Sequence, residues 1–362
     1  MPHRFAHLHL HTNYSLLSGA SRIEEIIHRA RELRFDALAI TDTNGLYGAM
    51  EFYRQAREAG IRPIIGAQIE TDSARALCLA RDREGYASHC RIVTARHLAG
   101  KFDLAGTLAR NQRGIFILTD SPPLLRRLDG KIDPASLFRE MNRFGERCHV
   151  PYKGATCCAP ANLAHIPPVA TNDVHFIHPS RHELHRILTA IRKNKLLVEV
   201  TPSEVVHPEA WLKSAAEMEE LFDDAEGRRA MENAVRIADA CRLEIQTGKP
   251  IFPRFFTLPH IPPEVAGLTP PAALRKLALE GVNQRYRPAS AAALQRMNYE
   301  LEIIEKLGFS EYFLIVWDIV NFARRSDIPM SGAARRPTAS WRTRWASPAP
   351  IRSPTASRSN GS

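Results

Sequence analysis

The stretch Phe5-Ala6-His7-Leu8-His9-Leu10-His11-Thr12 decides the fold that we predict for this chain. Its histidines alternate with apolar residues, and successive side chains of a β-strand point to opposite faces. A strand here would bury Leu8 and Leu10 and present His7, His9 and His11 on its other face. Imidazole is the commonest metal-ligating side chain. The pattern by itself fits two interpretations equally: a metal site, and a polar edge strand with three unrelated histidines.

The residues that follow alternate between expected helices and strands. Ser21-Arg22-Ile23-Glu24 has the form of a capping box at a helix start, and apolar residues then recur at helical spacing as far as Leu33. A strand at 36–41, a helix at 47–58 and a strand at 61–69 come next, and this order predicts right-handed crossovers and a parallel sheet. Further elements are expected at 77–80, 84–98, 114–118 and 168–171.

Polar residues follow several of the expected strands. In an α/β barrel, functional groups gather at the C-terminal ends of the strands, and here these ends carry Thr41-Asp42-Thr43, Gln68, Glu70, Thr119-Asp120-Ser121 and Asn172-Asp173-Val174-His175. Asp173 and His175 are two residues apart, which places them on one face of extended chain.

A second group of histidines falls in an expected helix at 179–192. His178, His182 and His185 would share one helix face. A zinc site is one interpretation of this face. A plain polar face is the favoured one, because no carboxylate pattern such as HExxH accompanies the histidines.

From about Leu197 onward the sequence is mainly helical. Apolar residues at a spacing of three and four predict helices at 216–222, 228–241, 271–286, 291–307 and 312–325, with a proline-rich linker at 248–259. The last helix is unusually apolar, which indicates burial in a larger assembly. We therefore expect three parts: an α/β barrel at 1–195, a helical segment at 196–332 and a disordered tail at 333–362.

Composition limits the class of protein. The chain has 362 residues, of which 44% are hydrophobic and 24% charged, as in ordinary soluble globular proteins. Residues 333–362 hold six arginines and no acidic residue, so they supply six of the ten net positive charges. The six cysteines form no CxxC pair, which favours reduced thiols. No signal peptide and no apolar run of about 20 residues is present, and we expect a cytoplasmic protein without a membrane partner.

Several segments carry a family resemblance. They are Phe5-Ala-His-Leu-His-Leu-His-Thr-Asn-Tyr-Ser-Leu-Leu-Ser-Gly-Ala20, Ala39-Ile-Thr-Asp-Thr-Asn-Gly45, Asp82-Arg-Glu-Gly-Tyr86, Val169-Ala-Thr-Asn-Asp-Val-His-Phe176 and Gly308-Phe-Ser-Glu-Tyr-Phe-Leu-Ile-Val-Trp-Asp318. In this order, from residue 5 to about 332, the chain resembles the N-terminal part of bacterial DNA polymerase III alpha subunits, which are replicative or error-prone C-family polymerases. The last segment is the most specific.

The resemblance implies a fold and partners. It implies a polymerase-and-histidinol-phosphatase (PHP) domain, which is a distorted seven-stranded β/α barrel, at 1–195 and the helical start of the polymerase thumb and palm at 196–332. It also implies DNA synthesis in replication or in error-prone repair, with DNA, deoxynucleoside triphosphates and other replisome or repair-polymerase subunits as partners and magnesium as the polymerase metal.

The polymerase half is incomplete relative to this family. The family continues after Pro329 with a Gly-Arg-Gly-Ser turn and an apolar helix, and its catalytic aspartates come later. Here Ser331-Gly332 begins the turn, and an Arg/Pro/Trp/Ser-rich stretch replaces the rest. We expect a frameshift near residue 333 that truncates the protein, so the chain would hold no polymerase catalytic residue.

The resemblance also assigns the metal-ligand positions of the barrel. His9, His11, Asp173 and His175 match them, whereas Ser18, Thr43, Gln68, Arg75 and Ser121 depart from the usual acidic, histidine or cysteine ligands. Fewer anionic ligands weaken the binding of several hard cations, and Arg75 adds a positive charge. A residual zinc or manganese site stays open, and the main expectation is a structural PHP domain.

Two other hypotheses remain. The first is a stand-alone metal-dependent phosphoesterase or 3′–5′ exonuclease that uses the residual metal site. The second is a non-catalytic DNA-binding or scaffold module that uses the arginine-rich tail, because arginines without acidic neighbours bind DNA phosphates.

Overall fold

The computed structural model describes residues 4–144, 161–246, 248, 253–255, 263–286 and 288–329. The chain divides into two compact units, Met1–Gln246 and Thr247–Ser362. Most of the expected linker at 248–259, the tail at 333–362 and three cysteines (Cys148, Cys157 and Cys158) lie outside the described residues.

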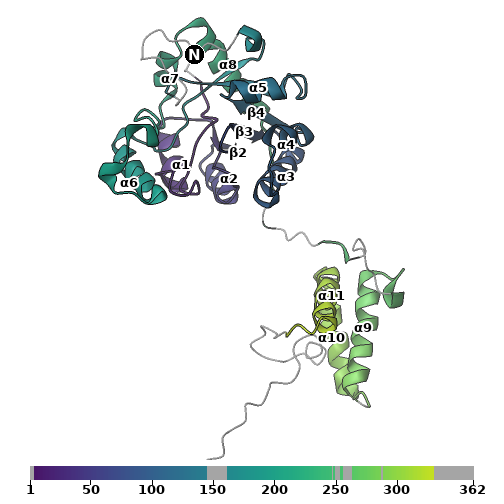
Figure 1. Cartoon of the computed structure of the whole chain (residues 1–362). Coiled ribbons are helices and arrows are strands. Elements are labelled where there is room, and N and C mark those ends of the chain that lie inside the picture. The colour runs from purple at the N-terminus through teal and green to yellow at the C-terminus, as the bar shows by residue number, and fades with distance from the viewer. Residues whose placement is uncertain are drawn as a thin grey trace, which may run out of the picture. The chain divides into compact units, whose positions relative to one another are not determined.

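The first unit is built on a six-stranded sheet in the order β1-β2-β3-β4-β5-β6 (Figure 1). The strands are β1 (Ala37–Ile40), β2 (Arg62–Glu70), β3 (Arg75–Ala80), β4 (Ile115–Thr119), β5 (Leu137–Asn142) and β6 (Pro168–Thr171). Three neighbouring pairs are parallel, but β3 runs antiparallel to both β2 and β4. The expectation of a parallel sheet is therefore wrong at β3, because only a short turn joins β2 to β3, whereas a parallel pair would need a longer crossover connection such as a helix.

The histidine stretch connects the two edges of this sheet. On one side it pairs with β1, because Ala39 N–H donates to His7 O at 3.0 Å and Thr41 N–H to Leu10 O at 2.9 Å. On the other side it pairs with the residue that follows Asp173, since Val174 N–H donates to His9 O at 3.0 Å. The segment thus acts as a seventh member that closes the sheet into a distorted barrel, as predicted.

Helices cover the outside of the barrel. They are α1 (Ile23–Glu32), α2 (Ala49–Glu58), α3 (Arg83–Leu98), α4 (Leu104–Arg110), α5 (Pro122–Leu128), α6 (His182–Lys193), α7 (Ala215–Leu221) and α8 (Ala225–Ala240). The predicted capping box of α1 is wrong by one residue. Arg22 is the N-cap and its N–H donates to Glu25 Oε2 at 2.8 Å, while the Ser21 hydroxyl oxygen accepts from Ile177 N–H at 3.2 Å.

Helix α8 belongs to the barrel unit. Its residues Ala230, Ala234 and Ile237 are fully buried in the same core cluster as the strands, and the side-chain amide of Asn233 donates to Pro168 O on β6 at 2.7 Å. The compact unit therefore extends to Gln246, past the boundary expected at residue 195.

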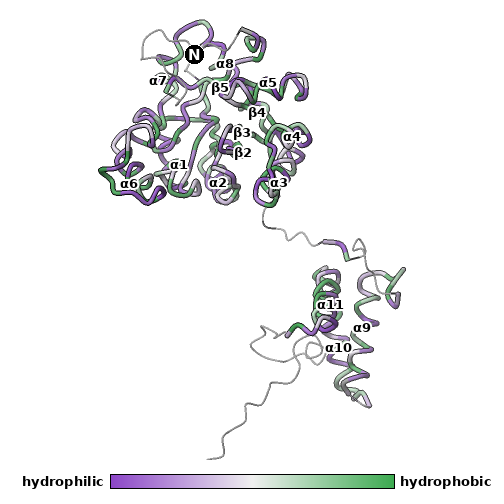
Figure 2. Tube along the Cα trace, in the orientation of Figure 1, coloured by the Kyte–Doolittle hydropathy of each residue, from purple (hydrophilic) through white to green (hydrophobic). Residues whose placement is uncertain are grey.

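The second unit is a small helical cluster. It contains α9 (Pro270–Arg285), α10 (Ala291–Lys306) and α11 (Ser310–Arg325), close to the ranges predicted from their apolar spacing. They pack around a common core that includes Leu274, Met297 and Leu314. In Figure 2 much of α11 is hydrophobic, yet Ile319 and Phe322 are each 59% exposed. Within the described residues, no helix is long and apolar enough to span a membrane.

Candidate metal centre

Two of the three alternating histidines lie in one polar cluster inside the barrel, and the third does not. His9 and His11 are buried and face Asp173, which follows β6. His7 instead donates from Nε2 to Lys213 O at 2.8 Å and packs edge-on against the rings of Phe5 and Phe35. The prediction that all three share a site face is therefore wrong for His7.

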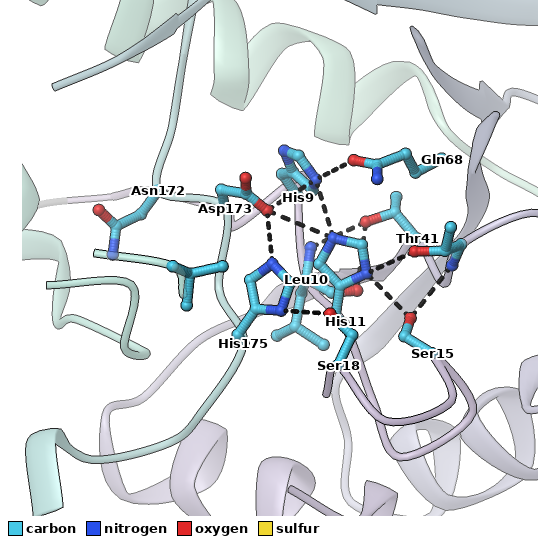
Figure 3. Close-up of polar contacts among 12 residues, drawn as sticks. His9, Leu10, His11, Ser15, Ser18, Thr41, Gln68, Asn172, Asp173 and His175 are labelled. Atoms are coloured by element: carbon cyan, nitrogen blue, oxygen red, sulfur yellow. Dashed lines mark hydrogen bonds and ion pairs between the residues drawn. The ribbon is translucent and has the colours of Figure 1, made fainter. Parts of the chain in front are cut away.

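Asp173 lies at the centre of the cluster (Figure 3). Its Oδ1 is 3.0 Å from His9 Nε2, 3.3 Å from His11 Nε2 and 3.1 Å from His175 Nε2. The two nitrogens His9 Nε2 and His11 Nε2 are 3.1 Å apart. Asp173 has a left-handed backbone with φ of +45°, a conformation that aspartate tolerates better than most residues. The structure thus brings together the four residues expected from the sequence.

The other ring nitrogen of His9 is held by a carboxylate. His9 Nδ1 is 2.6 Å from Glu140 Oε1 on β5, and the Thr171 hydroxyl donates to the same oxygen at 2.7 Å. An ionised carboxylate only accepts hydrogen bonds, so the proton of a neutral His9 lies on Nδ1. Its Nε2 then presents a lone pair to Asp173.

His11 is held in the same tautomer by a serine. The Ser15 hydroxyl donates to Asp42 Oδ1 at 2.6 Å. Because a hydroxyl has one proton, Ser15 has none left to donate to His11. Its oxygen accepts from Thr43 N–H at 3.1 Å and lies 2.9 Å from His11 Nδ1. The ring therefore donates from Nδ1, and the Nε2 of a neutral His11 is also a bare acceptor.

Gln68 adds a further acceptor. Its Oε1 is 2.9 Å from His9 Nε2, and its amide nitrogen faces Glu70 Oε2 at 3.5 Å. Acceptors from four residues thus converge: His9 Nε2, His11 Nε2, Asp173 Oδ1 and Gln68 Oε1. Only a proton or a metal cation can sit favourably among such atoms.

The pKa shifts of the cluster agree with this need for a proton or a metal cation among the acceptor atoms. Burial disfavours the protonated form of His9, but the carboxylates of Asp173 and Glu140 outweigh it and raise the pKa of His9. Burial lowers the pKa of His11 and takes that of His175 to about 4. Burial would raise the pKa of Asp173, but His9 and Arg75 hold it well below its usual value. Without a metal, His9 is thus the residue that takes up a proton.

The donor set fits a metal ion. His9, His11 and Asp173 offer ligand atoms within 4.8 Å of one another, and all three residues are buried. Donor atoms this close can share one ion at the bond lengths of about 2.0–2.2 Å that zinc forms with nitrogen and oxygen. A histidine ligand normally donates its second nitrogen to a carboxylate or another acceptor, as His9 and His11 do here.

Four of the five positions that depart from the family pattern also contact the cluster. Besides Gln68, the Ser18 hydroxyl is 3.2 Å from His175 Nδ1, the Thr43 hydroxyl is 3.5 Å from His11 Nδ1, and Arg75 Nη1 donates to Asp173 Oδ2 at 2.8 Å. Ser121 is buried, and its hydroxyl has no hydrogen-bond partner among the described residues.

The second histidine group forms no site with one shared face. His178 precedes the helix and its Nδ1 accepts from Ser180 N–H, His182 Nε2 donates to Val206 O at 3.1 Å, and buried His185 Nδ1 donates to Ser18 O at 2.8 Å. The favoured interpretation as a plain polar helix face is therefore wrong for His185, which is buried.

Sequence reasoning missed the supporting residues Glu140, Ser15 and Asp42. Strand β5 was not predicted, because its residues 137–142 place apolar and charged side chains without strict alternation. Asp42 lies at the end of the expected strand at 36–41, but its carboxylate accepts from Thr12 and Ser15 and does not face the centre. A buried glutamate on a strand gives no periodic signal that could have identified its role.

The cluster borders a cleft of about 620 Å³. Among the residues that line it are Ser18, Thr43, Gln68, Arg75, Asp120, Asp173 and His175. The candidate metal centre is therefore open on one side, since Asp173 and His175 line this cleft while His9 and His11 are buried behind them.

Comparison with known proteins places both parts of the chain. Residues 7–203 match the PHP domain, and residues 272–340 match the bacterial DNA polymerase III alpha NTPase domain. The chain is 30% identical over 348 residues to DNA polymerase III subunit alpha of Bacillus subtilis, covering 90% of this chain and 30% of that protein. It is 32% identical over 368 residues to an error-prone DNA polymerase of Symbiobacterium thermophilum, covering 91% and 33%.

A solved structure also aligns with part of the chain. It is a metal-dependent phosphoesterase from Bifidobacterium adolescentis, at 14% identity and a TM-score of 0.31, over 48% of this chain and 88% of that one. The chain spans about a third of the length of the two polymerases above. On the family matches, this chain belongs to the PHP domain family and continues into the beginning of a DNA polymerase III alpha-type polymerase module.

Proposed function

We propose that this chain is the N-terminal portion of a DNA-directed DNA polymerase of the DNA polymerase III alpha type. The observation that carries the proposal is the order of the two matches, with the PHP domain at 7–203 followed by the polymerase module at 272–340. The complete protein would act in replication or error-prone repair synthesis in the cytoplasm. It would bind DNA, deoxynucleoside triphosphates and other replisome or repair-polymerase subunits, with magnesium at its polymerase site.

The coding DNA tests the polymerase part of this proposal. Translating the codons of residues 325–362 and those downstream in all three frames should restore a Gly-Arg-Gly-Ser turn and an apolar helix in another frame. The purified chain with magnesium and deoxynucleoside triphosphates should then fail to extend a primer. A chain that extends primers, or a gene in which no frame restores the turn, would contradict this assignment.

We also infer that the barrel holds one divalent cation, zinc or manganese, in a structural role. His9, His11 and Asp173 would hold the ion, with Gln68 and His175 beside them. The support is the convergence of acceptor atoms around Asp173, with the two Nδ1 protons committed to Glu140 and Ser15. When bound, the ion would supply the positive charge that these acceptors require.

A structural role follows from where the donors lie in the chain. His9 and His11 come from the segment that closes the barrel, and Asp173 comes from the end of β6. Binding of one ion would therefore tie the first residues of the unit to the last strand of the sheet. Metal analysis and thermal unfolding test this: His11→Ala should lose the ion and lower the melting temperature, and both effects should be absent for His28→Ala on the exposed face of α1.

A catalytic role is the second candidate. The observation that favours it is the cleft of about 620 Å³ beside Asp173 and His175, which could admit a phosphate ester or a DNA 3′ end. Against it, neutral Gln68, Ser18 and Thr43 supply none of the anionic ligands that a multi-ion hydrolytic site needs. Manganese-dependent hydrolysis of a phosphomonoester or of DNA 3′ ends, lost in His9→Ala, would establish the catalytic candidate. Its absence in the metal-loaded chain would leave the structural one.

A further inference from the structure

The guanidinium of Arg75 lies between two carboxylates at the edge of the candidate metal centre. Arg75 Nη1 donates to Asp173 Oδ2 at 2.8 Å, and Nη2 donates to Asp120 Oδ2 at 3.3 Å. Arg75 begins β3, and its backbone oxygen accepts the Thr119 hydroxyl at 2.6 Å. This contact fixes the arginine beside the end of β4, from which Asp120 follows.

The two oxygens of Asp173 face different partners. Oδ1 faces the imidazole nitrogens of the metal centre, whereas Oδ2 faces Arg75. Each oxygen of a carboxylate can accept from, or bind, a separate cation. The cation at Oδ2 is therefore the guanidinium of Arg75, a side chain of the protein, and not a bound ion.

Asp120 holds a second oxygen atom that no donor among the described residues uses. Its Oδ1 is buried without a hydrogen-bond partner, although buried polar atoms are nearly always paired. Together with Asp120 Oδ2 and Asp173 Oδ2, which Arg75 contacts, it makes a group of oxygen ligands of the kind that hard divalent cations prefer.

From this arrangement we propose that Arg75 takes the place of a second metal ion and so limits the barrel to a single ion. Replacing Arg75 by a neutral residue would open a second ion site on Asp120 and on Oδ2 of Asp173. The reason is charge: without the guanidinium, two largely buried carboxylates lose their positive partner, and an uncompensated buried charge is costly. A bound divalent cation would supply the positive charge that these two carboxylates then lack. The single-ion count of this proposal rests on the proposed function.

The test compares manganese binding in four full-length chains. They are the unchanged protein, Arg75→His, Arg75→Lys and, as a matched surface control, Arg54→His, each stripped with a chelator and then dialysed against Mn²⁺. We expect one bound manganese per chain in the unchanged protein, in Arg75→Lys and in Arg54→His, and two in Arg75→His. The electron paramagnetic resonance spectrum of Arg75→His alone should show magnetic coupling between two neighbouring ions.

Two results would overturn the proposal: Arg75→His binding no more manganese than the unchanged protein, or the unchanged protein already binding two ions. Circular dichroism would establish that each variant is folded. If Arg75→His does not fold, Arg75→Ala is used in its place, with the same expected gain of one ion.

A second substitution separates this proposal from the proposed function. Combining Arg75→His with Asp120→Asn should remove only the gained ion, whereas combining it with His11→Ala should remove only the original one. If the unchanged protein binds no manganese, the single-ion role of the barrel fails. The Arg75 proposal then stands only if Arg75→His gains an ion that Asp120→Asn abolishes.

Discussion

The carboxylate of Glu140 accepts the Nδ1 proton of His9 at 2.6 Å, with both side chains buried. This contact fixes which nitrogen of His9 points at Asp173, and it joins β5 to the segment that closes the barrel. The geometry of the metal centre therefore depends on a residue that is not itself a ligand.

Glu140→Gln should weaken metal binding more than it weakens the fold. The amide can still contact His9, but it lacks the charge that raises the basicity of the ring and favours its Nδ1–H tautomer. Loss of such a supporting residue typically lowers metal affinity by about 10- to 100-fold. Competition with a zinc-binding dye would measure this, with Glu58→Gln on the surface of α2 as the control. Equal affinities for the two variants would contradict the role of Glu140.

Ser15→Ala should reduce metal affinity by a different route. The hydroxyl is the acceptor for His11 Nδ1–H, and without it a buried donor is left unpaired, at a cost of about 1–3 kcal/mol. His11 can avoid this cost by moving its proton to Nε2, where it donates to Asp173 and blocks the metal. The same dye competition would report the loss.

Ser88→Ala is the matched control for this prediction. Its hydroxyl is also lost from a buried position, but it donates to Arg113 O away from the metal centre. Ser88→Ala should leave the affinity unchanged. A Ser15→Ala protein that binds zinc as tightly as Ser88→Ala would show that the tautomer of His11 does not control binding.

The sequence specified some parts of this centre and not others. Period-two spacing put His9 with His11, and Asp173 with His175, on one face of extended chain, but it also included His7; the family resemblance is what singled out these four residues as ligand positions. Glu140 could not, because its role depends on β5 lying next to β6, which is a long-range pairing without a local signal.

The same limit applies to the fold. Helices with a regular apolar spacing, such as α9 and α10, were predicted to within one residue at each end, because that spacing is local. The reversal of β3 and the packing of α8 on β6 were not predicted. The reversal of β3 follows from the short turn after β2, whereas the packing of α8 on β6 is a long-range contact without a local signal.

Stability should fall as the pH drops from about 6.5 towards 4, partly because of His89. Burial lowers the pKa of His89 to about 4, from an ordinary value of 6.5. Between these values the unfolded chain binds the proton and the folded chain does not, so acid favours unfolding. One such histidine contributes at most about 1.4 kcal/mol per pH unit to this slope.

Urea unfolding at several pH values, in the presence of a chelator, would check this contribution. His89→Gln should be less stable at pH 7 but lose less stability per pH unit below 6.5 than the unchanged protein. His28→Gln, at an exposed position on α1, should keep the original slope. Identical slopes for the unchanged protein and His89→Gln would contradict the prediction.

A fragment of residues 1–246 should fold by itself, whereas a fragment that ends at residue 203 should not. The family match ends at 203, but α8 buries Ala230, Ala234 and Ile237 against the strands. Arg62 on β2 also donates to Asp239 Oδ1 in α8 at 3.0 Å and to Cys241 O, just after α8, at 3.3 Å. Removing α8 would expose the apolar surface that it covers on β6. A fully buried isoleucine contributes about 1.5–3 kcal/mol and a buried methyl group about 0.8 kcal/mol, so the loss is a large fraction of the about 5–15 kcal/mol that stabilises a typical domain. Circular dichroism should show cooperative thermal unfolding for 1–246 and none for 1–203, and a cooperative transition in the shorter fragment would place the true boundary near the predicted residue 195.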